Sequence, residues 1–415
     1  MLASQNSTLL QPDSLKETEQ VKERILAVGV VMALAAVAGT CKTVEADDVP
    51  EIIAGPYLQH VTQTSMTIMW ETDQPCTSII EYGRAERLRK NDPIPLKNRI
   101  EESKKKAIHE VVLKNLAPQT NHLYRVSSAN AGGSKTESQI YTFQTAVHRE
   151  TPFAFVVVGD NRTYPERFAK VMARAWAERP NFVVNVGDLV TDGNVKEQWI
   201  KEYLEPAAEL MRRVPTYVAI GNHERNADWY YKYVSYPQPE NYYSFDYGNA
   251  HFAMIDSNKN LSAKSKQYDW LKKDLAGSRA TWKFVCHHHP PYSSDENDYG
   301  DTYRGSSELG DKNVRQLVPL YDQYKVDIVW YGHIHDYERT WPLRAGRVDQ
   351  KNGVVYIQTG GGGAELENFA PTRSWFTAKV LSNWQYCLVT IAEGTLRMMA
   401  YDIDGRMYDY LELKK

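Results

Sequence analysis

The chain has 415 residues, of which 42% are hydrophobic and 24% are charged, and its formal net charge is −3. This length exceeds that of one typical domain, and the composition is that of a globular protein. The balanced charge gives no sign of a nucleic-acid partner, which would require concentrated basic charge. Four scattered cysteines without CxxC spacing argue against a zinc finger or a disulfide framework.

An apolar stretch lies near the N-terminus, at residues 25–40, and follows Lys22 and Arg24. It is shorter than the roughly 20 residues that a membrane-spanning helix needs. A basic flank, a short apolar core and small residues before Ala46 are typical of an export signal. Lipid attachment at Cys41 and an uncleaved anchor are the alternatives, and both imply membrane attachment through residues 25–41. All three readings place the body of the protein outside the cytoplasm.

Residues 50–146 have the alternating pattern of β-strands, separated by turn residues. The pattern is clearest at residues 65–70, 77–82, 109–113, 123–127 and 139–143. About seven short strands in this length predict an all-β sandwich, with Trp70 in its core. The highly charged segment 89–106 is expected to be a solvated loop.

The remaining residues, 151–415, have a different texture. Continuous apolar runs, each ended by a turn, occupy residues 153–158, 181–186, 216–220, 282–286 and 327–331. Such runs predict buried strands, and the stretch 166–179 between two of them predicts a helix. We therefore expect an α/β chain of two domains, the β-sandwich (50–146) and a layered α/β domain (151–415), preceded by a polar lead with a signal or anchor (1–49).

Polar side chains follow the predicted strands of the second domain, where open α/β folds place their sites. They are Asp160, Asp188, Asn222, His288, His333 and His335. Carboxylate, amide and imidazole ligands suit iron, zinc or manganese. A carboxylate can bridge two ions, and a water held between two cations loses a proton near neutral pH. The resulting hydroxide can attack a phosphate ester.

The order of the blocks GDxx, GDLV, GNHE, HHHPPY and GHIHDYER, each after an apolar strand, resembles that of the calcineurin-like metallophosphoesterases. With the preceding sandwich, which is similar to a fibronectin type III domain, the chain most resembles the purple acid phosphatases and their bacterial relatives. The resemblance covers residues 50–415. It implies a four-layer α/β/β/α catalytic domain with two metal ions per chain.

The resemblance also assigns roles to the residues. It implies that Asp160 and His335 bind the first ion, that Asp188 bridges both ions, and that the second ion has three further ligands, Asn222, His288 and His333. His223 should point at the substrate and act on the leaving oxygen as electrophile or general acid, oriented by Glu224. His287 and His289 are expected to be neighbours of the site and not ligands.

Three departures from the family pattern concern the first ion and the proton donors. Thr191 stands where purple acid phosphatases have a tyrosine ligand, so an iron-loaded form should lack the purple colour. Arg162 stands where other metallophosphoesterases have a histidine; it cannot be a ligand but could clamp a substrate phosphate. Asn161 or a water would then complete the first ion. Asn297 and Asp298 replace a histidine pair, which puts a second proton donor in doubt.

The expected activity is hydrolysis of a small phosphate ester by a metal-bound hydroxide, and an acid-phosphatase-like monoesterase is favoured. Phosphodiester or nucleotide hydrolysis at the same site is the first alternative. A non-catalytic surface binding module is the second, because fibronectin-type domains often mediate contacts and the first ion lacks its usual set of ligands.

Overall fold

The computed structural model describes residues 49–85, 92–294, 309–370 and 372–415. The expected export signal, Cys41, Asn297 and Asp298 lie outside these ranges. No helix within them combines the length and the apolar character that crossing a bilayer requires.

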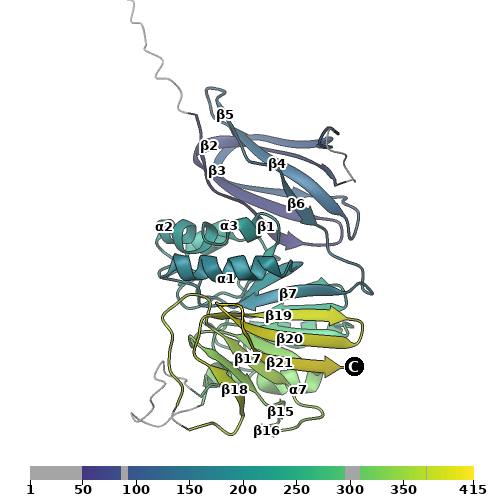
Figure 1. The fold of residues 1–415 in the computed structure, drawn as a ribbon, viewed down its shortest axis with the longest axis vertical. Coiled ribbons are helices and arrows are strands. Elements are labelled where there is room, and N and C mark those ends of the chain that lie inside the picture. Colours follow the sequence, from purple (N-terminus) through teal and green to yellow (C-terminus); the bar gives the residue numbers. More distant parts are fainter. Residues whose placement is uncertain (1–48, 86–91, 295–308, 371) are drawn as a thin grey trace, which may run out of the picture. The chain divides into compact units, whose positions relative to one another are not determined.

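The N-terminal domain is all β, as predicted, and the six strands in its described residues pair antiparallel (Figure 1). They are β1 (Ile52–Val61), β2 (Met66–Arg84), β3 (Asn98–Leu113), β4 (Asn121–Ala129), β5 (Lys135–Glu137) and β6 (Tyr141–Gln144). The strands are fewer than the seven expected because β2 and β3 are long, with 19 and 16 residues. Trp70 of β2 is fully buried, and its indole donates to Ser128 Oγ at 3.0 Å.

The prediction of a solvated loop over residues 89–106 is wrong in its second half, because β3 begins at Asn98. The charged side chains of this strand pair with one another: Lys106 Nζ lies 3.0 Å from Glu102 Oε2, and Arg99 Nη2 lies 2.8 Å from Glu101 Oε2. A charge run therefore does not distinguish an exposed strand from a loop, since solvent accommodates both.

The second domain contains two large sheets. A six-stranded sheet has the order β21-β20-β19-β7-β8-β9, and a seven-stranded sheet has the order β10-β11-β12-β13-β17-β14-β18. The first sheet consists of β7 (Phe153–Val158), β8 (Phe182–Asn185), β9 (Thr216–Val218), β19 (Gln385–Ala392), β20 (Thr395–Asp402) and β21 (Met407–Lys414). The second consists of β10 (Tyr243–Tyr247), β11 (Ala250–Met254), β12 (Trp282–Cys286), β13 (Ile328–Tyr331), β14 (Tyr337–Thr340), β17 (Val355–Thr359) and β18 (Thr377–Leu381). A small hairpin, β15 (Leu343–Arg344) and β16 (Arg347–Val348), stands apart.

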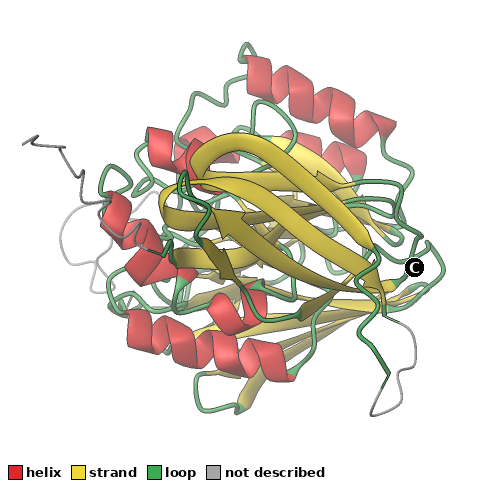
Figure 2. Cartoon of the chain, turned by 90° about the horizontal axis from the view of Figure 1, so that it is seen from above, coloured by secondary structure: helices red, strands yellow, loops and turns green. Residues whose placement is uncertain are grey.

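The helices lie on the outer sides of the strands (Figure 2). They are α1 (Pro165–Ala177), α2 (Lys196–Gln198), the π-helical turn η1 (Trp199–Leu204), α3 (Ala208–Met211), α4 (Asp228–Tyr233), α5 (Lys266–Gly277), α6 (Lys312–Arg315) and α7 (Val318–Tyr324). Helix α1 begins with a proline at its first position and buries Phe168, Val171, Met172 and Ala175. This spacing presents one apolar stripe to the sheet.

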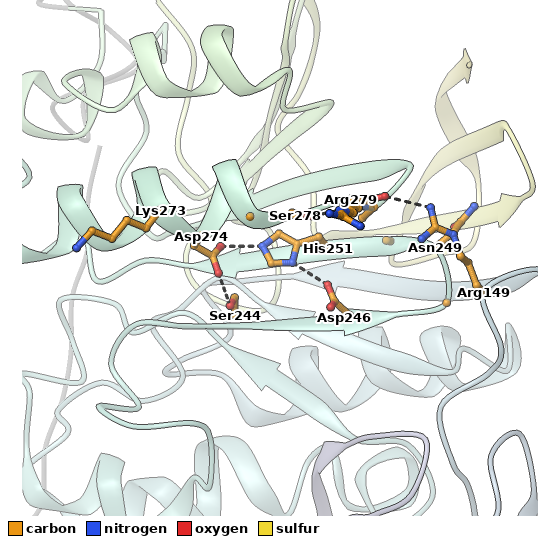
Figure 3. A pocket seen from close by; sticks show the side chains of 13 residues that line it. Arg149, Ser244, Asp246, Asn249, His251, Lys273, Asp274, Ser278 and Arg279 are labelled. Carbon is orange, nitrogen blue, oxygen red and sulfur yellow. Dashed lines mark hydrogen bonds and ion pairs between the residues drawn. The ribbon is translucent and has the colours of Figure 1, made fainter.

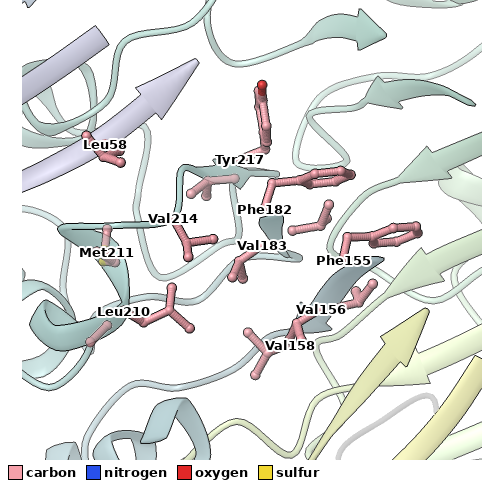
Figure 4. Packing of buried hydrophobic residues seen from close by; sticks show 14 of the residues in the cluster. Leu58, Phe155, Val156, Val158, Phe182, Val183, Leu210, Met211, Val214 and Tyr217 are labelled. Atoms are coloured by element: carbon pink, nitrogen blue, oxygen red, sulfur yellow. The ribbon is translucent and has the colours of Figure 1, made fainter. Parts of the chain in front are cut away.

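Aromatic side chains fill the space between the two sheets. The ring of Phe155 in β7 meets Phe252 of β11 at 5.1 Å and Phe284 of β12 at 5.5 Å, both edge to face. Figure 4 shows the same cluster continuing through Phe182 and Val183 of β8 to Leu210 of α3 and to Leu58 of β1. Cys76, Cys286 and Cys387 are buried and form no disulfide among the described residues. They pack as small apolar side chains.

Tyrosine hydroxyls bind the sandwich to the catalytic domain. Tyr217 of β9 accepts from the amide of Val61 at 3.1 Å and donates to its carbonyl at 3.0 Å. Tyr57 of β1 donates to the carbonyl of Tyr233 at 3.0 Å. These bonds satisfy buried polar groups at the junction, so the sandwich is packed against the second domain by specific contacts.

Candidate metal centre

The parallel strands of the two sheets end at one place. Asp160 follows β7, Asp188 follows β8 and Asn222 follows β9, while His288 follows β12 and His333 follows β13. Ligand atoms of Asp160, Asp188 and His288 all lie within 4.8 Å of one another in a buried group. The convergence arises because the carboxyl ends of parallel strands share an edge of each sheet, and the two sheets face one another.

Three of these residues have a left-handed backbone: φ is +56° at Asp160, +56° at Asp188 and +76° at His333. This conformation is uncommon for residues other than glycine and costs free energy that the surrounding structure must offset. Aspartate tolerates it best. The bends turn each side chain back across the strand end, and such strain concentrates at functional sites.

Four side chains form what we call the second-ion set: Asp188, Asn222, His288 and His333. The Nε2 atom of His288 lies 3.0 Å from Asn222 Oδ1 and 3.3 Å from Asp188 Oδ1. The Nδ1 atom of His333 lies 3.2 Å from Asn222 Oδ1 and 3.3 Å from His288 Nε2. Ligands bound at about 2.0–2.2 Å around one divalent ion are separated by about 3 Å, so these spacings fit a single ion.

The chemistry of His288 supports the same conclusion. Its Nδ1 lies 3.0 Å from the carbonyl oxygen of Val186, which can only accept a hydrogen bond, so Nδ1 carries a proton. The Nε2 atom, which faces the two oxygens, therefore carries either a lone pair or a second proton. Burial lowers the pKa of His288, but the carboxylates of Asp188 and Asp160 outweigh burial and raise it to about 10. The pocket thus favours a positive charge at this point.

Three side chains form the first-ion set: Asp160, Asp188 and His335. The Nε2 atom of His335 lies 3.7 Å from Asp160 Oδ1, and its Nδ1 donates to the carbonyl of Glu365 at 2.7 Å. The Asp160 carboxylate also accepts the backbone amide of His333, at 2.9 Å to Oδ2. Burial raises the pKa of Asp160 well above its usual value. A cation would offset this cost, so the first-ion set also fits a metal ion.

Arg162 reaches into the first-ion set. Its Nη2 lies 3.3 Å from His335 Nε2, and its Nε lies 3.5 Å from Asp188 Oδ2. Asn161, expected as a substitute ligand, is turned away: its amide donates to the carbonyl of Leu189 at 2.9 Å, and its oxygen accepts from Asn185 at 2.8 Å. The side chain that enters the first-ion set is therefore the arginine.

His223 stands beside the carboxylate shared by the two sets. Its Nε2 lies 3.9 Å from Asp188 Oδ2, and its backbone amide donates to Asp188 Oδ1 at 3.0 Å. Its Nδ1 lies 2.6 Å from the carbonyl oxygen of Thr191. That carbonyl, and not Glu224 as expected, fixes the orientation of the ring.

Glu224 holds the loops of the site together. Its buried carboxylate accepts the backbone amides of Asp188 at 3.0 Å, Leu189 at 2.6 Å and Gly221 at 2.6 Å. Burial and the neighbouring Asp188 raise the pKa of Glu224 to about 7. The residue therefore joins the loop after β8 to the loop after β9, a role for which its place in GNHE gave no signal.

The other neighbours of the site have structural partners. His287 packs among tyrosine rings, with centroid separations of 6.3 Å to Tyr321 and 5.9 Å to Tyr331. His289 Nδ1 bonds to Ser257 Oγ at 2.8 Å. The hydroxyl of Thr191, at the family's tyrosine position, donates to Glu202 Oε2 at 2.9 Å. Glu202 also accepts the amides of Thr163 and Thr191, and no sequence pattern indicated this contact.

The sequence models of two known families match the two domains of this chain. Residues 153–337 match the sequence model of the calcineurin-like phosphoesterases, and residues 55–145 match that of the purple acid phosphatase N-terminal domain. The first match begins at β7 and ends just after His335, so it encloses both sets of side chains.

Proteins similar to this chain in sequence and in structure include acid phosphatases and purple acid phosphatases. Acid phosphatase type 7 of Danio rerio is 24% identical over 404 residues, which cover 85% of this chain and 89% of that protein. Probable inactive purple acid phosphatase 27 of Arabidopsis thaliana is 23% identical over 351 residues, which cover 73% of this chain but only 55% of the plant protein. The solved structure of purple acid phosphatase PPD1 from yellow lupin shares the fold, with a TM-score of 0.76 at 20% identity, covering 88% of this chain and 74% of that one. Residues 153–337 therefore form a calcineurin-like metallophosphoesterase domain, which is the domain of a family of phosphoric ester hydrolases, and residues 55–145 form a purple acid phosphatase N-terminal domain ahead of it.

Proposed function

We propose that the chain hydrolyses small phosphate monoesters at a centre of two metal ions. The observation that carries this proposal is the buried cluster of Asp160, Asp188 and His288, whose ligand atoms lie within 4.8 Å of one another. Ions bound there would polarise a phosphoryl oxygen and generate a nucleophile from water near neutral pH. Iron, zinc and manganese all suit the mixture of oxygen and nitrogen ligands.

The side chains of the centre would divide the work. Asp188 would bridge the two ions, because Oδ1 lies toward His288 while Oδ2 lies toward Arg162 and His223. The remaining ligands would be Asp160 and His335 for one ion, and Asn222, His288 and His333 for the other. This division follows the two sets described above.

His223 would protonate the leaving oxygen. Its Nδ1 proton points to the carbonyl of Thr191, which leaves Nε2 as the atom that can hold or give up a proton. Arg162 would bind the phosphate, because a guanidinium offers several donors in one plane. Its side chain is 19% exposed and so can be reached from solvent.

Two other functions remain to be distinguished from monoester hydrolysis, and the experiment below separates all three. A phosphodiesterase would use the same residues with a larger substrate. A non-catalytic binding module is favoured by one observation, that a relative covering most of this chain is named as a probable inactive phosphatase. Retention of His223 beside the shared carboxylate supports the hydrolase.

The test is hydrolysis of p-nitrophenyl phosphate and of bis(p-nitrophenyl) phosphate by full-length protein loaded with iron, zinc or manganese. We expect turnover of the monoester and its loss in Asp188→Asn, which removes the charge shared by the two ions. Faster hydrolysis of the bis ester would indicate a diesterase. Absence of turnover with every metal, in protein shown by elemental analysis to be loaded, would refute the hydrolase and favour the binding module.

The site of action is also a proposal. The apolar residues 25–40 with their basic flank support export, so we place the activity outside the cytoplasm, with the chain either released or attached to a membrane through residues 25–41. The partner that we propose for the site is a small phosphate ester.

A further inference from the structure

Arg162 and the first metal ion need the same lone pair. We propose that the guanidinium of Arg162 competes with the ion of the first-ion set for His335 Nε2, so that the second-ion set fills first and the first-ion position fills only when Arg162 moves away. The proposal rests on the two-ion centre of the proposed function and concerns the order in which that centre is loaded.

The tautomer of His335 makes the competition unavoidable. Its Nδ1 lies 2.7 Å from the carbonyl oxygen of Glu365, which has no hydrogen to donate, so the proton of this bond belongs to Nδ1. A neutral imidazole then has a single lone pair, on Nε2. Arg162 Nη2 lies 3.3 Å from that atom and can only donate to it. One lone pair cannot accept this hydrogen bond and ligate an ion at the same time.

Asp188 is contested by the same arginine. Arg162 Nε lies 3.5 Å from Asp188 Oδ2, the oxygen that faces away from His288. Among the described residues, no other arginine or lysine forms an ion pair with Asp160 or Asp188. The arginine therefore offsets part of the negative charge of the two buried carboxylates of the first-ion set, on the side away from His288.

The arginine is held loosely enough to be displaced. Its Nε is buried but makes no hydrogen bond within the described part of the chain, and its Nη1 reaches Thr163 Oγ1 only at 3.5 Å. The pairing is thus not the bidentate fork that makes an arginine–carboxylate bond strong. A divalent ion with two anionic ligands and an imidazole can replace it, and the released guanidinium then lies beside the position where a phosphate would bind.

The second-ion set lacks such a competitor. His288 also donates from Nδ1 to a carbonyl, that of Val186, but among the described residues its Nε2 faces Asn222, Asp188 and His333 Nδ1, and no arginine or lysine. A metal ion entering this set takes the place of a proton on a ligand and displaces no arginine or lysine among the described residues. The two halves of the centre should therefore differ in affinity although they share Asp188.

The test is equilibrium dialysis of full-length protein against Mn²⁺, followed by metal analysis, and electron paramagnetic resonance to detect the spin-coupled pair. We expect the wild-type chain to bind one ion tightly and a second at least about tenfold more weakly, a size typical of changes to residues around a metal. Arg162→Ala should strengthen the weaker step. Arg162→His should strengthen it further, because it adds an imidazole ligand in place of the competitor. Lys201→Ala, which removes an exposed positive charge paired with Glu205, should match the wild type.

Two results would overturn the proposal. One is an equal separation of the two binding steps in wild type and Arg162→Ala. The other is weaker binding of the second ion in that variant, which would show that the arginine supports the ion. Because binding is measured directly, a chain that loads in the expected order but hydrolyses no ester would refute the proposed function and leave the competition intact.

Discussion

Backbone carbonyls set the chemistry of three histidines at the centre. The Nδ1 atoms of His223, His288 and His335 face the carbonyl oxygens of Thr191, Val186 and Glu365 at 2.6–3.0 Å. Each carbonyl fixes the tautomer and the ring orientation, so every Nε2 points into the centre. The loop after β8 supplies the carbonyls of Val186 and Thr191, and the loop after β17 supplies that of Glu365. These carbonyls determine which nitrogen can bind an ion or transfer a proton.

The role of His223 leads to the first prediction. His223→Ala should lower kcat by about 10²–10⁴-fold, because the variant loses a positioned proton donor. Its metal content should stay at the wild-type level, because the resemblance assigns the ions to other side chains. The measurement is kcat for p-nitrophenyl phosphate together with elemental analysis of the same samples.

His148→Ala is the matched control, since His148 is an exposed histidine outside the site, and its kcat should equal that of the wild type. Loss of metal in His223→Ala would contradict the assignment, because it would make His223 a ligand. The split between kcat and metal content separates the two roles.

At the scale of elements, glycines allow the strand ends to approach one another. A Cβ on Gly332, at the end of β13, would lie 2.1 Å from Asp160 Oδ2. A Cβ on Gly221, after β9, would lie 2.2 Å from Asp188 Oδ1. No real Cβ atom tolerates such distances, so strands from the two sheets can carry ligands to one centre only if these positions lack side chains.

Gly332→Ala is the second prediction. The added methyl group should push the Asp160 carboxylate aside, weaken the weaker of the two metal-binding steps and cost about 1–3 kcal/mol of stability. Metal titration and thermal unfolding measure the two effects. Gly277→Ala at the end of α5 is the control, because its Cβ would meet nothing within 4 Å. Normal metal binding by Gly332→Ala would show that the carboxylate can move without loss.

A second polar cluster joins β10, β11 and α5, and none of its members belongs to the two metal-ion sets. His251 bonds through Nδ1 to Asp246 Oδ1 and through Nε2 to Asp274 Oδ2, both at 2.7 Å, and Ser244 Oγ donates to Asp274 at 2.6 Å (Figure 3). The cluster lines a pocket of about 540 Å³, where Arg149, Lys273 and Arg279 are the nearby cations. Two carboxylates around one imidazole require that the imidazole be charged.

The pH dependence of stability is the third prediction. Burial lowers the pKa of His251, but the hydrogen bonds that the ring donates to the carboxylates of Asp246 and Asp274 outweigh burial and raise it to about 9. The cluster therefore contributes fully below about pH 6.5, the value of an unfolded histidine, and loses its contribution as the pH rises through 9. The loss should reach about 3 kcal/mol.

The measurement compares Tm from pH 6 to pH 10 in wild type and His251→Gln, which keeps one hydrogen bond but cannot be charged. The wild type should lose its advantage over the variant across this range. A constant difference in Tm at all pH values would mean that His251 is not charged in the folded chain.

These features show which parts of the fold and site are predictable from the sequence. The runs at residues 153–158 and 282–286 have the bounds of β7 and β12, because an apolar run ended by a turn leaves little other choice. The hydrogen-bond partners of individual side chains were not predictable. Glu224 bonds to amides and not to His223, and Asn161 turns away from the centre, because both depend on how loops pack after folding. The start of β3 was missed because charge, and not periodicity, dominates its sequence.

At the scale of the whole molecule, the sandwich is connected to the loops that position His223. Glu71 of β2 is 1% exposed, and its carboxylate meets Lys196 Nζ at 2.5 Å and the hydroxyl of Tyr233 at 2.6 Å. Lys196 follows the loop that contains Thr191, and Tyr233 ends the helix that follows His223. One carboxylate from the first domain thus braces both segments of the second domain that hold the proton donor.

Glu71→Gln is the last prediction. The variant keeps the shape of the side chain but leaves Lys196 without its buried counter-charge. Because the lysine is 39% exposed and water can solvate it, the loss of stability should be about 1–3 kcal/mol and not the larger cost of a fully buried pair. We also expect kcat to fall severalfold at saturating metal, since the Thr191 carbonyl that orients His223 lies on the loosened loop.

Metal content should not change in Glu71→Gln, because Glu224 holds the ligand loops independently of the sandwich. Tyr233→Phe is the matched comparison: it removes one hydrogen bond and retains the ion pair, so its effects on Tm and kcat should be smaller. If Glu71→Gln lowers Tm but leaves kcat unchanged, the sandwich only stabilises the fold. If both fall while the metal remains bound, the first domain takes part in catalysis by holding the loop of the proton donor in place.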